Sequence, residues 1–303
     1  MRTKRTGLLM AAMASALLLA GACSSDSSTS TTATSAGGST GSTPGTSPKG
    51  TTPGTTPGTM TPVSEIEGMV ADATLKADGT LTICSDIPYA PFEFEDDNGE
   101  LTGFDVELVD AMAEEMNLET DFQTTPFDGI IPALVAGNCD VIVSATTITD
   151  ERAEQVLFTD PYFDADQSLL VTAENKDAYK SLDDMGGKNI GVQSGTTGAD
   201  YAEENKPEGA TIKEYQGADE LFAAIVAGDI DAILQDFPVN AYRALQDPEV
   251  FAVTETFPTG EQYGMAVTLE NTNLADALNA ALGNVRASGT YDEIYASWFG
   301  EGE

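Results

Sequence analysis

Apolar side chains recur along residues 63–303 with two alternating periods. Residues 81–84 (Leu-Thr-Ile-Cys) read as a strand, whereas apolar residues in 104–116 and 274–285 recur three and four positions apart, as on one face of a helix. The first helical stripe consists of Phe104, Leu108, Ala111, Met112 and Met116. Alternating strand and helix patterns predict an α/β fold in which these stripes form the core.

One stretch of the chain occurs twice. Residues 131–144 and 222–235 are identical at six of fourteen positions, at a constant offset of 91. In each copy a predicted helix ends at a glycine, Gly137 or Gly228, which suits a left-handed C-cap, and a short apolar strand follows from Asp140 or Asp231. Any α/β protein can reuse such a unit, but two copies favour two similar lobes.

Each repeated strand is followed by polar residues. Ser-Ala-Thr-Thr at 144–147 follows the first copy, and Gln235 and Asp236 end the second. Ligands of open α/β sheets bind beyond the carboxyl ends of the strands. Two such ends that face each other predict a cleft.

The N-terminus reads as a secretion signal and a tether. After basic residues at 2–5, a run of 16 residues from Gly7 to Ala22 contains only Ser15 as a polar side chain, which is short of the roughly 20 residues of a membrane span. We predict a signal peptide at 1–22, followed by a lipidated Cys23; the alternative is an ordinary cleavage site with an incidental cysteine. Residues 23–62 are predicted to be a disordered linker, because 34 of the 39 residues at 24–62 are Ser, Thr, Gly or Pro.

The composition excludes several classes of function. The chain has 50 acidic and 13 basic residues, a net charge of −37, three cysteines and no histidine. Nucleic-acid binding and docking on anionic lipid by charge both require clustered Lys and Arg. Without histidine, the Ser-His-Asp and Cys-His catalytic arrangements are excluded and the usual zinc sites are implausible. We expect no cofactor and no metal.

Three local features match the charges of a free α-amino acid. Arg152 lies in the first turn of a helix that Thr149 caps, and its guanidinium suits a carboxylate. Residues 190–197 (IGVQSGTT) form a strand, a glycine turn and a helix start, whose N–H groups would face an anion. Asp236 would accept an ammonium group. The alternatives are an arginine paired with a neighbouring acid and an aspartate that merely caps a helix.

The chain resembles the family 3 bacterial solute-binding proteins, which serve ABC importers of polar amino acids. The resemblance covers about 81–300 and rests on GFDVEL at 103–108, SDIPYAPFE at 85–93, FDGIIPAL at 127–134, TITDER at 147–152, FTDPY at 158–162 and SGTYDEIY at 288–295. It implies an α/β, type II periplasmic-binding-protein fold, a two-lobe Venus flytrap with two hinge strands near 162–167 and 260–263. Lobe 1 would comprise 78–163 and 264–303, and lobe 2 would comprise 164–263.

The resemblance also implies roles for individual residues. Arg152 would bind the ligand α-carboxylate with N–H groups of Thr147 and Thr197, and Asp236 would bind the α-ammonium with the Thr147 hydroxyl and the Ala145 carbonyl. Other residues would surround the ligand side chain: Asp86, Tyr89, Phe127 and Gln193.

Specificity depends on the side-chain end of this site. Gln193 stands where the glutamine-binding protein has a lysine. Compared with that protein, the side-chain end of this pocket has no cation, but it has the carboxylate of Asp86. We therefore expect arginine or lysine first, then glutamine, and not glutamate. The alternative for Tyr89 and Phe127 is ordinary lobe core.

The cysteines test this layout. Cys84 would lie near the carboxyl end of one parallel strand and Cys139 at the start of its neighbour, well over 7 Å apart at about 3.3 Å per residue. We therefore expect no Cys84–Cys139 disulfide.

The sequence thus predicts a non-enzymatic, lipid-anchored, extracytoplasmic monomer that captures a polar amino acid and delivers it to a membrane permease. One alternative is a cyclohexadienyl or arogenate dehydratase-like enzyme with Asp236 or Asp86 as general acid. Another is a ligand-sensing domain for a partner receptor.

Overall fold

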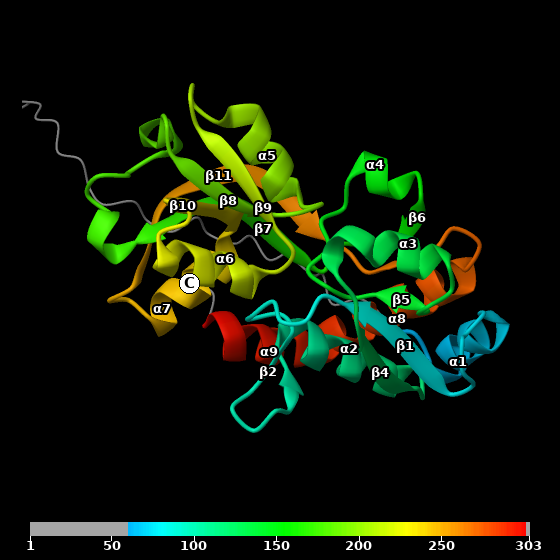
Figure 1. Cartoon of the computed structure of the whole chain (residues 1–303). Coiled ribbons are helices and arrows are strands. Elements are labelled where there is room, and N and C mark those ends of the chain that lie inside the picture. Colours follow the sequence, from blue (N-terminus) through cyan, green and yellow to red (C-terminus); the bar gives the residue numbers. More distant parts are fainter. Residues whose placement is uncertain (1–59, 301–303) are drawn as a thin grey trace, which may run out of the picture. The chain divides into compact units, whose positions relative to one another are not determined.

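The computed structural model describes residues 60–300 (Figure 1). The predicted signal peptide, the candidate lipidated Cys23 and most of the predicted linker lie outside this range. Within it, no helix combines the length and the apolar composition needed to span a membrane.

The first of two large sheets has the strand order β4-β1-β5-β12-β6. Its members are β1 (Thr80–Ser85), β4 (Glu119–Thr124), β5 (Val141–Ile142), β6 (Val156–Phe158) and β12 (Ala266–Thr268). β1 is parallel to β4 and β5, whereas β12 is antiparallel to β5 and β6. The sheet therefore combines an N-terminal segment with a C-terminal strand.

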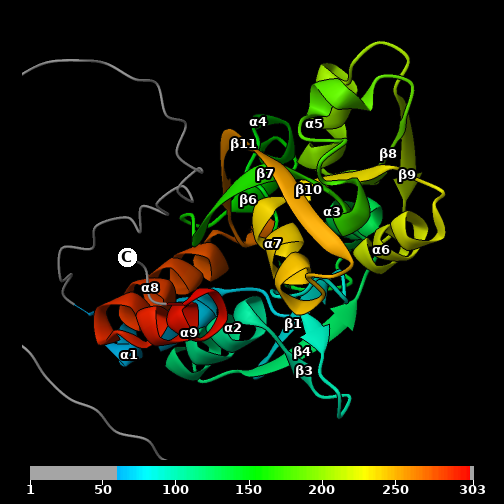
Figure 2. The same cartoon turned by 90° about the vertical axis from the view of Figure 1, so that its left-hand side faces the viewer.

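Helices cover both faces of the first sheet. They are α1 (Val63–Asp72), α2 (Phe104–Glu115), α3 (Ile130–Val135), α4 (Asp150–Ala153), α8 (Thr272–Ser288) and α9 (Thr290–Phe299). Ile83 of β1 packs in the core that α2 and α8 share, and Cys84, the next residue, packs against α3. The alternation places α2 and α8 on one face and α3 on the other, and Figure 2 shows α1, α2, α8 and α9 gathered together.

The helical stripes predicted from the sequence are buried. Phe104, Leu108 and Met112 are fully buried on α2, and Leu274 and Leu278 are fully buried on α8. The stripes are therefore confirmed as core. Helix α1 lies before the predicted start of lobe 1 at residue 78, yet its Ile66 is fully buried in the same core.

The second sheet has the order β11-β7-β10-β8-β9. Its strands are β7 (Phe163–Thr172), β8 (Asn189–Gln193), β9 (Thr211–Tyr215), β10 (Ala232–Asp236) and β11 (Phe251–Tyr263), and its helices are α5 (Thr197–Asn205), α6 (Ala218–Ala227) and α7 (Phe237–Gln246). Leu234 packs in the cluster with Ala202 of α5, whereas its neighbour Ile233 packs in the cluster with Leu221 of α6. The two helices thus cover opposite faces.

Short elements complete the fold. A hairpin joins β2 (Phe94–Glu95) to β3 (Leu101–Thr102), and three 3-10 turns are η1 (Phe127–Gly129), η2 (Ala173–Asn175) and η3 (Leu182–Met185).

The chain passes from the first sheet to the second between β6 and β7 and returns between β11 and β12. At these crossings β7 and β11 pair with each other, from Phe163 opposite Tyr263 to Ala165 opposite Glu261. The exact lobe limits stay a prediction, but the two crossing segments lie side by side.

The internal repeat corresponds to α3–β5 and α6–β10. Gly137 and Gly228 have φ values of 77° and 79°, so both adopt the predicted left-handed conformation. Asp140 exchanges two hydrogen bonds with the backbone of Thr82, and Asp231 does the same with Asn189. The repeated aspartate therefore fastens the start of each strand to its neighbour.

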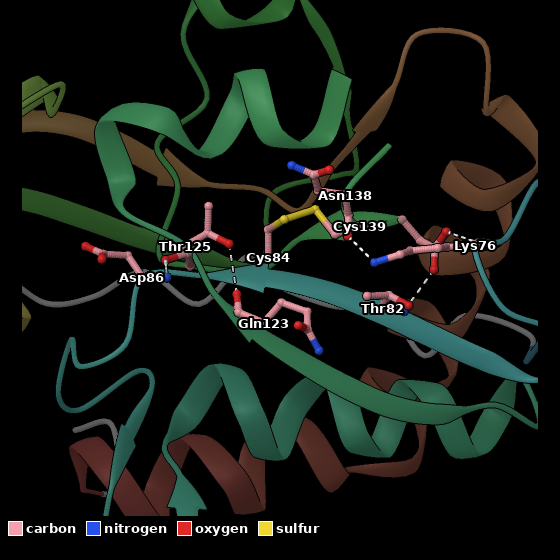
Figure 3. Close-up of a disulfide and its surroundings, with 10 residues drawn as sticks. Lys76, Thr82, Cys84, Asp86, Gln123, Thr125, Asn138 and Cys139 are labelled. Carbon is pink, nitrogen blue, oxygen red and sulfur yellow. Dashed lines mark hydrogen bonds between the residues drawn. A yellow bond between two sulfur atoms is a disulfide. The ribbon is translucent and has the colours of Figure 1, made fainter. Parts of the chain in front are cut away.

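The expectation that the two cysteines are separate was wrong: Cys84 and Cys139 form a disulfide, with Cα atoms 5.6 Å apart (Figure 3). Cys84 does lie near the carboxyl end of β1, opposite Ile142. The error was to treat Cys139 as a strand residue, because β5 begins only two residues later and Cys139 lies in the turn that leaves α3. That turn brings Cys139 onto the face of Cys84, where both pack against Ile130 and Leu134.

Candidate functional site

One pocket lies where the carboxyl end of β1 and the segment after β5 meet the carboxyl ends of β8 and β10. Its empty space, open solvent included, is about 300 Å³. The structure brings all nine predicted site residues together in this lining: Asp86, Tyr89, Phe127, Ala145, Thr147, Arg152, Gln193, Thr197 and Asp236. Their role in binding stays a prediction. Two further lining residues, Ser144 and Thr196, were not predicted.

Arg152 presents its charge to the pocket without a carboxylate partner. Thr149 caps α4 as expected, accepting the N–H of Arg152 at 3.2 Å. The guanidinium donates to the carbonyl oxygens of Thr147 at 2.7 Å and Gly195 at 3.0 Å, and it lies 5.2 Å from the centre of the Phe127 ring. Among the described residues it forms no salt bridge, so the alternative of an arginine paired with a neighbouring acid is not what the structure contains.

Asp236 is the opposite case, a carboxylate without a cation. It precedes α7, but its side chain makes no capping hydrogen bond, so it does not serve merely as a helix cap. Its oxygens instead accept from the hydroxyls of Tyr263 at 2.6 Å and Tyr89 at 2.8 Å, and from the Gln167 amide. Burial raises the pKa of Asp236, and the nearby Glu261 carboxylate raises that pKa further.

Thr147 follows β5 of the first sheet, Thr197 begins α5 after β8 of the second sheet, and both bind Glu261. The Glu261 carboxylate accepts from the Thr197 hydroxyl at 2.6 Å and from the Thr147 hydroxyl at 2.9 Å. Thr196 caps α5 by accepting the N–H of Ala199 at 3.1 Å, so Thr197 begins that helix, where the first N–H groups have no partner within the helix. This corner therefore offers hydroxyl and N–H groups beside Arg152.

The side-chain end of the pocket joins Asp86 to Gln193. The Gln193 amide donates to the Asp86 carboxylate and, at 2.9 Å, to the carbonyl of Gln216. Burial raises the pKa of Asp86 to about 6; the charge of Asp128 adds to the rise, and the hydrogen bond from Gln193 opposes it. The pocket thus contains a second carboxylate that no cation neutralises.

Comparisons with known proteins identify the family of this chain. The model of the bacterial extracellular solute-binding proteins, family 3, matches residues 81–301. The chain belongs to this family. In Escherichia coli (strain K12), the histidine-binding periplasmic protein is 35% identical over 227 residues, covering 72% of this chain and 87% of that protein. The ABC transporter arginine-binding protein 1 of the same strain is 37% identical over 216 residues, covering 70% and 87%.

Solved structures of this family share the fold. An ancestral arginine-binding protein bound to arginine is 39% identical with a TM-score of 0.69, covering 73% of this chain and 99% of that one. An ancestral amino acid-binding protein described as a precursor of cyclohexadienyl dehydratase is 38% identical with a TM-score of 0.69, covering 78% and 99%. The predicted type II, two-lobe α/β fold is confirmed, and the curated relatives are binding proteins rather than enzymes.

The sequence-based prediction missed three residues that lie behind the pocket lining. Gln167, Glu261 and Tyr263 lie on the two crossing strands and bind pocket residues directly. The only sequence signal was their place within the predicted hinge strands near 162–167 and 260–263. Tyr89 is part of the core, as the alternative reading held, but its hydroxyl also binds Asp236; Phe127 is half-buried beneath Arg152.

Within residues 60–300, no cluster of three or more acidic or cysteine side chains is arranged to hold a metal ion.

Proposed function

We propose that this family 3 protein captures a free polar L-amino acid, arginine or lysine in preference to glutamine, and delivers it to an ABC permease. The observation that carries the proposal is a pair of opposite charges that line one pocket without a salt bridge among the described residues, the guanidinium of Arg152 and the carboxylate of Asp236. A partly buried charge with only neutral partners is costly. The α-carboxylate and α-ammonium of an amino acid would neutralise both charges.

The charge balance of the pocket supports a cationic side chain. Asp86, Asp236 and Glu261 oppose a single Arg152. An amino acid with a neutral side chain leaves Asp86 without a counter-ion, whereas the guanidinium of arginine or the ammonium of lysine provides one. Glutamate would place a second carboxylate against Asp86 and is disfavoured.

Ligand binding should favour closure of the two lobes, because both predicted lobes contribute side chains to the pocket. Asp86 and Arg152 belong to the predicted lobe 1, whereas Gln193 and Asp236 belong to lobe 2. A ligand that binds all four gains its full contacts only when the lobes are together, so it favours the closed form by that difference in affinity.

Different observations support delivery of the amino acid to a permease and the lipid anchor of the protein. Relatives named as periplasmic and as ABC transporter binding proteins support an extracytoplasmic location and a permease partner. The predicted signal peptide, the small residues before Cys23 and the linker support a lipid anchor on the outer face of the cytoplasmic membrane.

Calorimetry with the chain from Ser24 onward, against the twenty amino acids, tests the proposal. We expect arginine or lysine to bind most tightly and Arg152→Ala to abolish binding while the melting temperature of the free protein changes little. Arg243→Ala is the matched control, because Arg243 lies on α7 in an ion pair with Asp247 and does not line the pocket. Indifference to every amino acid, or equal losses in both variants, would refute the proposal.

A further inference from the structure

Two fully buried carboxyl groups, Glu93 and Asp105, hold the turn that lines the pocket. The Ser144 hydroxyl donates to Glu93 at 2.7 Å, and the Ala145 N–H donates to Asp105 at 2.8 Å. Asp105 also accepts from the hydroxyl of Tyr162 at 2.7 Å. Adjacent residues of one turn are therefore fastened to two different carboxyl groups.

A close backbone approach brings these two groups together. The N–H of Asp105 donates to the carbonyl of Phe92 at 3.0 Å, which places the start of α2 directly against the residue before Glu93. Gly103 permits this approach: a Cβ there would lie 2.1 Å from the Phe92 carbonyl oxygen, and its φ of 130° favours glycine.

Each carboxyl group has one oxygen without a partner. Glu93 Oε2 and Asp105 Oδ1 are buried and accept no hydrogen bond, although buried polar atoms are nearly always satisfied. The titratable groups that face the pair are Asp86, Tyr89 and Asp236 near Glu93, and Tyr162 near Asp105; none of them can carry a positive charge. Two neighbouring carboxylates without a cation cannot both stay ionised at low cost.

We propose that Glu93 and Asp105 share one proton through these two free oxygens and act together as positioning residues for the Ser144–Ala145 turn. One shared proton satisfies both oxygens and leaves a single negative charge. The other two oxygens remain free to accept from the turn.

The turn needs this support because Ala145 has a φ of 41°, a left-handed conformation that costs a non-glycine residue about 1 kcal/mol or more. Its neighbours matter for the ligand: Ser144 lines the pocket and accepts the N–H of Asp86 at 2.9 Å. The effect of the pair on ligand binding rests on the proposed amino-acid binding, whereas the sharing of the proton does not.

The Glu93–Asp105 pair makes the conformation of the Ser144–Ala145 turn sensitive to pH. Burial raises the pKa of Glu93, and the neighbouring Asp105 charge raises it further; burial also raises the pKa of Asp105, to about 6. Protonation is thus favoured in the folded protein. Loss of the shared proton at alkaline pH leaves two repelling carboxylates, and the turn that they hold loosens.

Carbon-13 NMR of the side-chain carboxyl groups of the free protein tests proton sharing directly, with assignment from Glu93→Gln and Asp105→Asn. We expect the pair to retain one proton at pH 7. Two fully ionised carboxylates at that pH would overturn the proposal, whether or not any amino acid binds.

Binding tests the positioning role. In Glu93→Gln the amide carbonyl accepts from Ser144 and the amide N–H replaces the shared proton, so we expect arginine affinity within about twofold of the wild type at pH 7. Glu93→Ala removes both groups and should weaken binding at least about tenfold. Equal weakening in both variants would show that binding requires the negative charge of Glu93 and not the shared proton, which would overturn the proposal.

The pH profile separates positioning from a purely structural role. The ratio of wild-type to Glu93→Gln affinity should fall as the pH rises from 7 to 9, because only the wild type loses a proton from the pair. Titration of the ligand ammonium affects both proteins and cancels in the ratio. A constant ratio contradicts the proposal.

If no amino acid binds the wild type, the proposed function fails, but the NMR result and the melting temperatures of the two variants still decide whether the proton is shared.

Discussion

Asp86 should make the capture of a cationic amino acid dependent on pH. Its pKa is about 6 in the free protein, because it is buried near Asp128, with only the Gln193 amide opposing the rise. A bound guanidinium or ammonium favours the ionised carboxylate and lowers this pKa. Binding must therefore release a proton below pH 6 and none well above it.

The size of the effect follows from that pKa. At pH 5, about ten Asp86 groups are protonated for each one that is ionised, so arginine affinity should be about tenfold lower than at pH 8. Asp236 also has a raised pKa and contacts any amino acid in the proposed mode, so a second ligand is needed to separate the two. Citrulline has nearly the shape of arginine without its side-chain charge.

Calorimetry with arginine and citrulline at pH 5, 6, 7 and 8 provides the assay. The arginine-to-citrulline affinity ratio should rise about tenfold between pH 5 and 8 in the wild type and stay constant in Asp86→Asn. At pH 8 the same substitution should cost arginine about 10- to 100-fold, as expected for a partly buried charged hydrogen bond, and cost citrulline much less. A ratio independent of pH in the wild type, or equal losses for both ligands, would refute the reasoning.

Three further predictions concern the fold. The melting temperature should fall by about 5 °C from pH 4.5 to pH 7 in scanning calorimetry, because the Glu93–Asp105 pair loses the first of its two protons in this range. Asp105 has a pKa of about 6 in the folded chain against an ordinary 3.8, so stability is lost as the pH rises between these values. Asp105→Asn should reduce the fall, and an unchanged slope would contradict this assignment. Reducing the Cys84–Cys139 disulfide, which closes a separation of 55 residues, should lower the free energy of unfolding by about 4 kcal/mol in urea titrations, and equal midpoints with and without reductant would show that the bond is absent. Gly103→Ala should destabilise by about 3 kcal/mol or more because its Cβ meets the Phe92 carbonyl, whereas Gly68→Ala on α1, with open space around it, should stabilise slightly; equal midpoints would refute the close approach.

Local patterns were enough to predict three features of the pocket lining, namely Arg152, the turn at Thr197 and Asp236, whereas Asp86, Tyr89, Phe127 and Gln193 were predicted from the family resemblance. Arg152 follows its cap Thr149 within three residues, and Asp236 follows an apolar strand directly, so both are legible from their neighbours in the chain. The repeat at 131–144 and 222–235 predicted two equivalent strand ends. Side chains at the carboxyl ends of strands converge by the geometry of α/β sheets, without knowledge of long-range contacts.

Only the tertiary structure decided which residues support that lining. Glu93 and Asp105 are 12 positions apart and bind adjacent residues of one turn, beside a close backbone approach that Gly103 permits, while Glu261 reaches Thr147 from 114 positions away. The disulfide likewise depends on a turn that places Cys139 over the sheet. Periodicity indicates the face on which a side chain lies, but the partners across that face depend on register and backbone approach, which one sequence does not encode locally.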